Sequence, residues 1–359
     1  MTKVLLTGKS RCPTDDFHDA NMSSGGSGFI AAHILDQLLE KDYTVVTTVR
    51  SEAKAQKIRD AHPGKAADGK LEVVIVPDIA QPGAFDEVAK TPGIDAVLHT
   101  ASPFHFNITD PKKDLVDPAV IGTTGILKAL HASAPSVKRV VITSSFASIL
   151  DEDKLTDPST TFSEASWNPV TVNDISRSPA TAYRASKTLA ERAAWDFVAN
   201  EKPSFDLVTV CPPLVLGPVS KHLATLESIN TSNERVVSLL RGGWKDSIPP
   251  CTPVPLWIDV RDAARAHVRG LENPEAGGKR LFATAGWFSH REFVDAVQRN
   301  FPEFADKLPG PEVKGGELPP KDQIFKFNVD ETNKILGIDW IKVDESIIDL
   351  VKSLKELGI

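Results

Sequence analysis

The chain has 359 residues, of which 41% are apolar and 25% are charged, and its formal net charge is −7. This composition is typical of a globular protein, and the length allows one large core or two domains. Because the balance of charge is acidic, nucleic acid and anionic membrane surfaces are disfavoured as the main partners. The overall charge still permits a local basic pocket for a phosphate.

Cysteine usage favours a reducing compartment. Cys12, Cys211 and Cys251 form no CxxC pair, and their odd number does not suit a disulfide framework. The sequence has no recognisable secretory leader and no run approaching the roughly 18 apolar residues of a membrane span. We therefore expect a cytoplasmic protein without a membrane partner. Homodimerisation is left open.

Short β-branched runs alternate with helical patterns through the first two-thirds of the chain. The runs are continuously apolar, as expected for strands buried on both faces of a parallel sheet. We expect strands at residues 4–8, 44–50, 71–76, 96–102, 139–145 and 206–216. The main helices are expected at 29–40 and, after a turn at 179–182, at 183–200. This alternation predicts an α/β fold with a doubly wound parallel sheet of the Rossmann type.

Prolines mark a change of organisation beyond about residue 213. Pro212, Pro213 and Pro218, followed by a second cluster at 249–255, interrupt the regular alternation. We therefore expect a dinucleotide-binding domain at residues 1–212 with a return segment at about 255–272. Residues 213–254 and 273–359 are expected to form a smaller, discontinuous C-terminal lobe that binds the substrate.

The phosphate-binding loop expected after the first strand is interrupted. Gly8 ends that strand and Gly28 opens the helix at 29–40, but 19 residues lie between these two glycines. Without residues 9–25, Gly8 would be followed by Gly26, Ser27 and Gly28, and then by Phe29 and Ile30. Such a compact glycine loop between a strand and an amphipathic helix brings backbone amides to a pyrophosphate. The glycine pattern alone is a weak signal, and its position makes it specific.

We interpret residues 9–25 as translated intron sequence. The segment is polar, patternless and in frame. Gly8-Lys9-Ser10 can be encoded as a splice donor, Ala20-Asn21 as a branch point and Ser24-Gly25 as an acceptor. The alternative is a genuine loop insertion, and the mature transcript decides between the two. If the protein retains the segment, its closure entropy should weaken cofactor binding.

Basic residues follow the second expected strand, where folds that prefer NAD place an acid for the ribose 2′-hydroxyl. Arg50 and Lys54 instead offer two cations to a 2′-phosphate, which predicts NADPH. A pair of solvated cations at a helix start is the alternative. Asp78 and Ile79, after the third strand, are expected beside the adenine.

Three further segments are expected to meet at the carboxyl edge of the sheet. The small side chains that close the fourth strand permit close approach of the cofactor; they are Thr100, Ala101 and Ser102. Tyr183 and Lys187 are four residues apart and share one face of a helix. A phenol that protonates an alkoxide needs a pKa below its usual value near 10, and a nearby ammonium lowers it. Ser145, at the end of the fifth strand, can hydrogen-bond the substrate oxygen.

The conjunction of these motifs resembles the extended short-chain dehydrogenases/reductases. More narrowly, the chain is similar to fungal NADPH-dependent methylglyoxal and ketone reductases, which are related to plant dihydroflavonol reductases. The matching stretches include residues 28–31, 49–51, 76–79, 98–104, 141–145, 166–169, 183–187, 217–218 and 258–262. Only residues 9–25 clearly depart from the pattern, and that departure falls on the segment expected to hold the cofactor phosphates.

The resemblance implies a role for each of these residues. Ser145 is expected as the catalytic serine in preference to Ser144, with Tyr183 as proton donor and Lys187 as its partner. NADPH contacts are implied for Arg50, Lys54, Asp78, Ile79, Tyr183, Lys187 and the segment from Pro212 to Val215. Phe104 and Phe146 are expected to line an apolar substrate pocket, and ordinary core aromatics are the alternative.

The predicted reaction is reduction of aldehydes or ketones, such as α-dicarbonyls or aryl ketones, to alcohols. A nucleotide-sugar epimerase or dehydratase on the same fold is one alternative, which Arg50 and Lys54 disfavour. A non-catalytic NADP-binding regulator is another, but it could dispense with Tyr183 and Lys187. His99, His105 and His267 lack metal-ligand spacing and are expected to be structural, so we predict no metal site.

Overall fold

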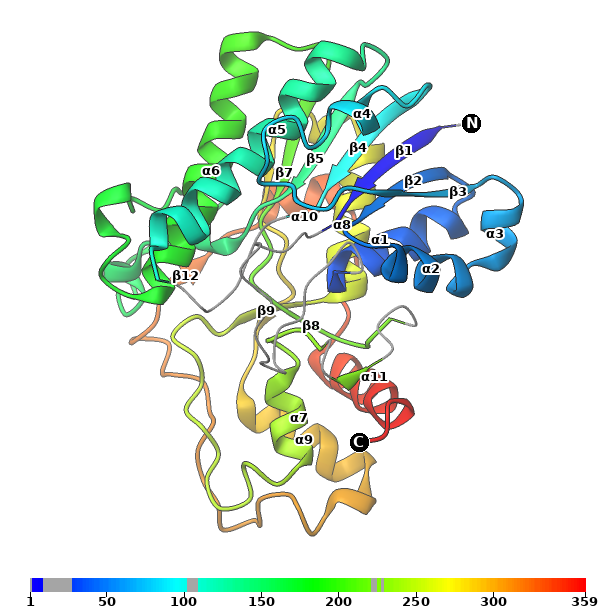
Figure 1. Ribbon diagram of the computed structural model, residues 1–359. Coiled ribbons are helices and arrows are strands. Elements are labelled where there is room, and N and C mark those ends of the chain that lie inside the picture. Colours follow the sequence, from blue (N-terminus) through cyan, green and yellow to red (C-terminus); the bar gives the residue numbers. More distant parts are fainter. Residues whose placement is uncertain (1, 9–27, 102–108, 221–224, 227–228) are drawn as a thin grey trace.

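The computed structural model describes residues 2–8, 28–101, 109–220, 225–226 and 229–359. Its centre is a seven-stranded parallel sheet in the order β10-β7-β5-β4-β1-β2-β3 (Figure 1). The strands are β1 (Lys3–Thr7), β2 (Thr44–Val49), β3 (Leu71–Ile75), β4 (Ile94–His99), β5 (Arg139–Thr143), β7 (Asp206–Val210) and β10 (Arg280–Leu281). The strand order reverses between β1 and β4, which is where doubly wound sheets bind ligands. The predicted fold class is confirmed.

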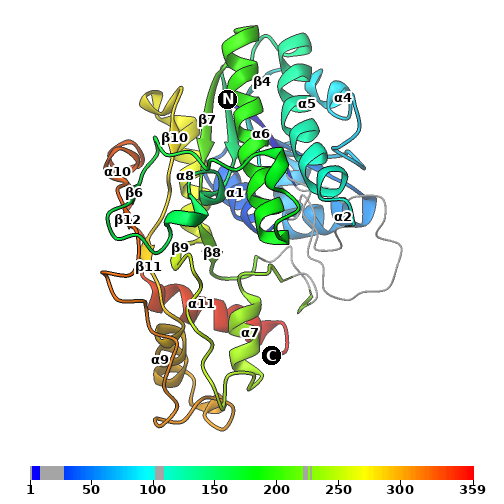
Figure 2. The ribbon, with the colours of Figure 1, turned by 90° about the vertical axis from the view of Figure 1, so that its left-hand side faces the viewer.

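Helices cover both faces of this sheet. One apolar cluster joins the sheet to α1 (Phe29–Glu40), α2 (Glu52–Ala61), α8 (Val260–Glu272) and α10 (Asp330–Leu336). The other cluster joins it to α4 (Asp86–Ala89), α5 (Asp117–Ser133) and α6 (Pro179–Glu201). Figure 2 shows α5 and α6 on one side of the strands and α1 and α8 on the other. Burial on both sides explains why the strands are apolar without alternation.

Helix α6 begins earlier than the sequence predicted. The expected turn at 179–182 is wrong, because Pro179 occupies the first helical turn and Ser178 caps the helix. The Ser178 hydroxyl accepts a hydrogen bond from the Thr181 amide at 3.0 Å. Proline is tolerated at that position because its missing N–H would have no partner within the helix. Tyr183 therefore lies in the second turn of α6.

The single strand expected at 206–216 is also wrong. The chain leaves the main sheet after β7, and β8 (Leu214–Leu216) belongs to a separate three-stranded sheet in the order β11-β9-β8. Pro212 and Pro213 lie between the two strands and cannot donate hydrogen bonds to a ladder. The bend leaves Pro212, Pro213 and Val215 beside the cavity described below.

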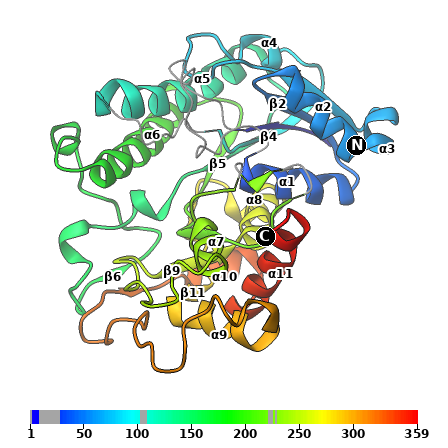
Figure 3. The same cartoon turned by 60° about the horizontal axis from the view of Figure 1, so that its bottom comes forward.

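The C-terminal part has an apolar cluster of its own. It includes side chains from α7 (Glu234–Leu240), α9 (His290–Asn300) and α11 (Val343–Glu356), together with β8 and β9 (Leu256–Asp259). In Figure 3 these helices lie beyond α1 and α8, on the side away from α5 and α6. A small parallel pair joins β6 (Thr161–Phe162) to β12 (Lys326–Phe327), and β11 (Gly286–Trp287) pairs with β9. Minor helical segments complete the fold: α3 (Pro63–Ala67), η1 (Lys112–Val116), η2 (Phe146–Ser148), η3 (Glu152–Lys154), η4 (Val172–Asp174), η6 (Pro274–Ala276) and η7 (Pro302–Phe304).

The predicted division into lobes remains a prediction, and the structure adds two details to it. Strand β10 falls in the segment expected to bind substrate, yet it pairs with β7 and completes the main sheet. Within the expected return segment, α8 packs on the main sheet, whereas β9 lies in the three-stranded sheet. No helix in the described part of the chain is long and apolar enough to cross a membrane.

Candidate active site

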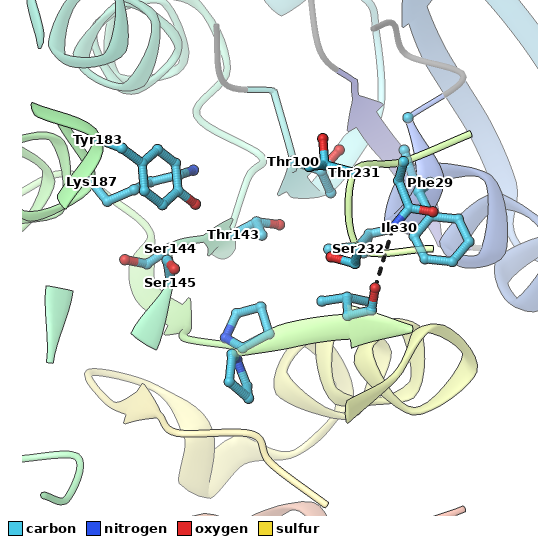
Figure 4. Close-up of a pocket in the computed structure, with 16 residues that line it drawn as sticks. Phe29, Ile30, Thr100, Thr143, Ser144, Ser145, Tyr183, Lys187, Thr231 and Ser232 are labelled. Atoms are coloured by element: carbon cyan, nitrogen blue, oxygen red, sulfur yellow. Dashed lines mark hydrogen bonds between the residues drawn. The ribbon is translucent and has the colours of Figure 1, made fainter. Parts of the chain in front are cut away.

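A cavity of about 280 Å³ opens at the carboxyl edge of the main sheet (Figure 4). Figure 4 shows Tyr183 and Lys187 on one side of it and Phe29 and Ile30 on the other, with Thr143 between them. Nine of the predicted site residues line it: Gly28, Phe29, Ile30, Thr100, Ser145, Tyr183, Lys187, Pro212 and Val215. The fold therefore unites segments that lie far apart in the sequence.

Tyr183 and Lys187 lie one helical turn apart on α6, and both line the cavity. Burial raises the pKa of the Tyr183 phenol above its usual value of 10.0, and a hydrogen bond with Ser145 acts in the opposite direction. The expectation that Lys187 lowers this pKa is therefore wrong, because burial raises it overall and the lowering effect comes from Ser145. The phenol is protonated at neutral pH and has a proton to donate, but it is a weaker acid than a lowered pKa would have made it.

Lys187 is the more easily titrated member of the pair. Burial lowers the pKa of its amine to about 8, against the opposing effects of Cys211 and Glu191. The Cys211 thiol itself has a pKa raised to about 12 by burial, so it is uncharged at neutral pH. The negative charge that supports the Lys187 ammonium there is the Glu191 carboxylate.

The structure separates the roles of the two neighbouring serines. Ser145 lies two residues beyond the end of β5, and its hydroxyl accepts a hydrogen bond from the Ala147 amide at 3.1 Å. Ser144 is buried, and its hydroxyl donates to Glu191 at 2.6 Å. Ser145 lines the cavity with Tyr183 and acts to lower the pKa of its phenol, which supports its choice over Ser144 as the serine of the site.

The other end of the cavity is the start of α1. Gly28 is the N-cap residue, with no side-chain cap and no acidic residue in the first turn among the residues described. The first amides of a helix lack partners within the helix and carry partial positive charge, so this end suits an anion. Gly8 follows β1 directly and is buried. Gly26, Ser102, Phe104 and the segment 9–25 lie outside the described residues.

The remaining predicted cofactor residues in the described part of the chain do not line the cavity. Arg50 follows β2, and Lys54 is in the first turn of α2; both are partly exposed. Asp78 accepts a hydrogen bond from the Ala80 amide at 2.9 Å, and Ile79 and Ala101 are buried in the core. Contacts from Ile79 and Ala101 to a ligand would therefore come from their backbones.

Phe146 is not part of the cavity wall. Its ring is 1% exposed and stacks on Phe282 with centroids 4.7 Å apart, in an aromatic cluster with Phe162 and Phe325. The alternative prediction, an ordinary core aromatic, fits this placement, and we do not carry Phe146 into the proposed site.

Two of the histidines have structural partners. His99 Nδ1 lies 2.6 Å from Thr7 Oγ1, and His267 Nε2 lies 2.6 Å from Thr143 Oγ1. Burial lowers the pKa of His99 to about 3 and that of His267 to about 4, so both are neutral at pH 7. Because His267 Nδ1 faces the Ala263 carbonyl at 2.7 Å, Nδ1 must donate and Thr143 must donate to Nε2.

Sequence reasoning missed several residues of the cavity wall. Asn230, Thr231 and Ser232 reach it from the segment before α7. Asn230 Nδ2 donates to the Val215 carbonyl at 3.3 Å, whereas its buried Oδ1 has no partner among the described residues. No local motif marks these residues, because only the fold brings them to the sheet edge.

Comparison with known proteins gives the family. The model of the NAD dependent epimerase/dehydratase family matches residues 24–283, most of the chain. The chain belongs to this family. It is thus an extended short-chain dehydrogenase/reductase, as the sequence motifs predicted. The match begins at residue 24, so β1 and nearly all of the segment 9–25 lie outside it.

Several similar proteins are reductases. The ketoreductase azaE of Aspergillus niger is 43% identical over 334 residues, which are 93% of this chain and 96% of that protein. The NADPH-dependent methylglyoxal reductase GRE2 of Saccharomyces cerevisiae is 41% identical over 338 residues, covering 92% and 96%. The structure of yeast methylglyoxal/isovaleraldehyde reductase Gre2 complexed with NADPH matches with a TM-score of 0.84 and 34% identity, covering 99% of each chain.

Proposed function

We propose that this protein reduces aldehydes or ketones to alcohols with NADPH. The observation that carries the proposal is the convergence of Ser145, Tyr183 and Lys187 on one cavity whose far end is the open start of α1. The reductase names of relatives that align over more than nine-tenths of this chain support the reaction class. The basic residues Arg50 and Lys54 after β2 support NADPH over NADH.

The residues present fit a dinucleotide. The amides at the start of α1 would hold the pyrophosphate, and Gly28 adds no side chain that would compete for them. The unpartnered Asn230 Oδ1 offers an acceptor to a hydroxyl or amide of the ligand. Arg50 and Lys54 would hold the 2′-phosphate, and Lys187 would bond the nicotinamide ribose.

Each side chain of the triad has a distinct task. Ser145 donates a hydrogen bond to the carbonyl oxygen and stabilises the charge that develops there. Tyr183 gives its proton to that oxygen, and Lys187 stabilises the phenolate that remains. Bound NADPH supplies the hydride that reaches the carbonyl carbon. The product is an alcohol, and a proton from solvent restores Tyr183.

The proposed substrates are α-dicarbonyls or aryl ketones. Ser145, Thr100 and Thr143 give the cavity wall hydroxyl groups, whereas Pro212, Pro213 and Val215 give it an apolar part. A small molecule with one hydrogen-bonding carbonyl and an apolar remainder suits such a site.

The test is NADPH oxidation against a panel of aldehydes, ketones and dicarbonyls, measured for the full chain and for a form lacking residues 9–25. We expect the shortened form to turn over and to bind NADPH about 30-fold more tightly, because a 19-residue connection becomes one of two residues. Absence of turnover from both forms would refute the reductase proposal. Equal NADPH affinity in the two forms would refute the expectation that residues 9–25 weaken cofactor binding.

A further inference from the structure

A buried carboxylate lies directly behind the proposed catalytic residues. Glu191 is on α6, one turn beyond Lys187 and two turns beyond Tyr183, and its side chain is 1% exposed. Arg280, from strand β10, binds it through Nε at 2.7 Å and is itself 9% exposed. The Arg280 guanidinium also lies over the Trp167 ring at 3.7 Å. A charge is buried at this depth only when it is paired and hydrogen-bonded.

Glu191 also ties together two neighbouring strands of the main sheet. Its Oε2 accepts from Ser144 at 2.6 Å and from Ser148 at 2.5 Å, and its Oε1 accepts from Thr209 on β7 at 2.7 Å. Ser144 and Ser148 flank Ser145 on both sides. The carboxylate therefore holds both ends of the short turn that presents Ser145 to the cavity.

The same carboxylate is the only ionised acid among the described groups that act on the Lys187 amine near neutral pH. Those groups are Glu191 on its own helix, Cys211 after β7 and His99 on β4, and Tyr183 lies one turn before Lys187 on the same helix. Tyr183, Cys211 and His99 are all uncharged at pH 7, since burial moves each pKa toward the neutral form. Arg280 lies beyond Glu191 and partly offsets its charge.

We propose that Glu191, paired with Arg280, is a positioning residue for the reaction: it orients the Ser145 turn through Ser144 and Ser148 and sustains the charge of Lys187. This inference rests on the proposed reductase function. A buried ion pair is not needed for core stability, because well-packed apolar residues of similar volume commonly stabilise a core as well or better. The positioning role gives the Glu191–Arg280 pair a reason to be there.

The first test uses Glu191→Gln, which preserves size and a hydrogen-bonding carbonyl while removing the charge. We expect kcat to fall about tenfold to a hundredfold, as for displaced reacting groups. The alkaline limb of kcat/KM for NADPH should move to lower pH by about half a unit or more, because the Lys187 ammonium loses its counter-charge. Wild-type kcat and an unmoved limb would overturn the proposal.

The second test uses Ser144→Ala, which leaves the ion pair intact and covers the case in which Glu191→Gln fails to fold. Tyr43 and Tyr183 are the two tyrosines of the chain, so a Tyr43→Phe background makes phenolate absorbance a direct measure of Tyr183. Because the hydrogen bond with Ser145 lowers the Tyr183 pKa, a displaced Ser145 should raise the titration midpoint. We expect the Tyr183 titration midpoint of Ser144→Ala to shift toward the midpoint of Ser145→Ala. The absorbance is read immediately after a pH jump.

This second readout needs neither cofactor nor turnover, so it separates failure of the inference from failure of the reductase proposal. An unchanged midpoint in Ser144→Ala would overturn the positioning role even if the enzyme is active. Asp206→Asn is the control, because it removes the partner of Arg139 at the opposite end of β5 and β7. It should lower Tm while leaving both the alkaline limb and the Tyr183 midpoint unchanged. If the alkaline limb or the Tyr183 midpoint also shifted in Asp206→Asn, the effects seen in Glu191→Gln and Ser144→Ala would be due to lost stability.

Discussion

At the start of α1, the first amides face the cavity without a side-chain cap from the described residues, whereas at the start of α6 the Ser178 hydroxyl accepts from the Thr181 amide. The two ends of the cavity also differ in how the polar side chains near them are hydrogen-bonded. Beside α6, the hydroxyls of Ser144, Ser148 and Thr209 are all taken up by Glu191. The α1 end of the cavity thus has backbone donors available to an anion, whereas the polar groups at the α6 end are satisfied within the protein and hold their side chains in place.

Removing the proposed proton donor should have the largest effect. Tyr183→Phe keeps the ring and deletes only the hydroxyl, so kcat should fall about a thousandfold, within the range for general acid catalysis. The Kd for NADPH, measured by fluorescence titration, should change little. Because residues 9–25 are expected to weaken cofactor binding, the variant is made in whichever form turns over. A Tyr183→Phe enzyme with near-normal kcat would remove Tyr183 from the mechanism.

Capping the N-terminus of α1 with an acidic side chain should have the second largest effect. Gly28 has φ −67° and ψ 149°, which any residue can adopt, so Gly28→Asp introduces no backbone strain. Its carboxylate would accept from the first amides and repel the pyrophosphate, and we expect NADPH to bind about a hundredfold more weakly. The free energy of unfolding of Gly28→Asp should be unchanged or higher, whereas a variant that damaged the binding loop would be less stable. Gly28→Ala, which adds no charge, is the control, and an equal loss of affinity there would implicate bulk in place of charge.

The pH dependence should reveal Lys187. Its amine has a pKa of about 8, so the ammonium is largely present below that pH and is lost as the pH rises through it. We expect kcat/KM for NADPH to fall about tenfold per pH unit above this value. Lys187→Arg keeps the charge to much higher pH. This variant should show lower activity without the limb near pH 8, and persistence of that limb would assign it to another group.

The smallest effect is expected at the cap of α6. Ser178→Ala removes the acceptor for the Thr181 amide, and the free energy of unfolding should fall by about 1 kcal/mol. Chemical denaturation measures this loss directly. Since Tyr183, the first proposed catalytic side chain of α6, lies more than a full turn further on, kcat should remain close to that of the unchanged protein. A large fall in kcat would mean that the start of α6 is coupled to the site more tightly than its contacts indicate.

Much of the fold was available from the sequence because it depends on local patterns. Continuous apolar runs specify strands buried on both faces, and the stripe at 29–40 specifies a helix whose observed bounds match. The Tyr183–Lys187 spacing places both side chains on one face of a helix wherever that helix begins. Local patterns failed at Pro179 and at Pro212–Pro213, where a proline's meaning depends on whether a helix or a sheet surrounds it.

The sequence by itself determined the parallel sheet, the helix at 29–40 and the residue types that point to NADPH-dependent reduction. Tertiary structure decided which of these residues meet. It brought Asn230 to the cavity from a segment with no motif, buried Phe146 in the aromatic core and raised the Tyr183 pKa where the spacing had predicted a lower one. It also joined Glu191 to Arg280, 89 residues away along the chain. Burial and long-range pairing depend on how elements pack, and no window of sequence contains that information.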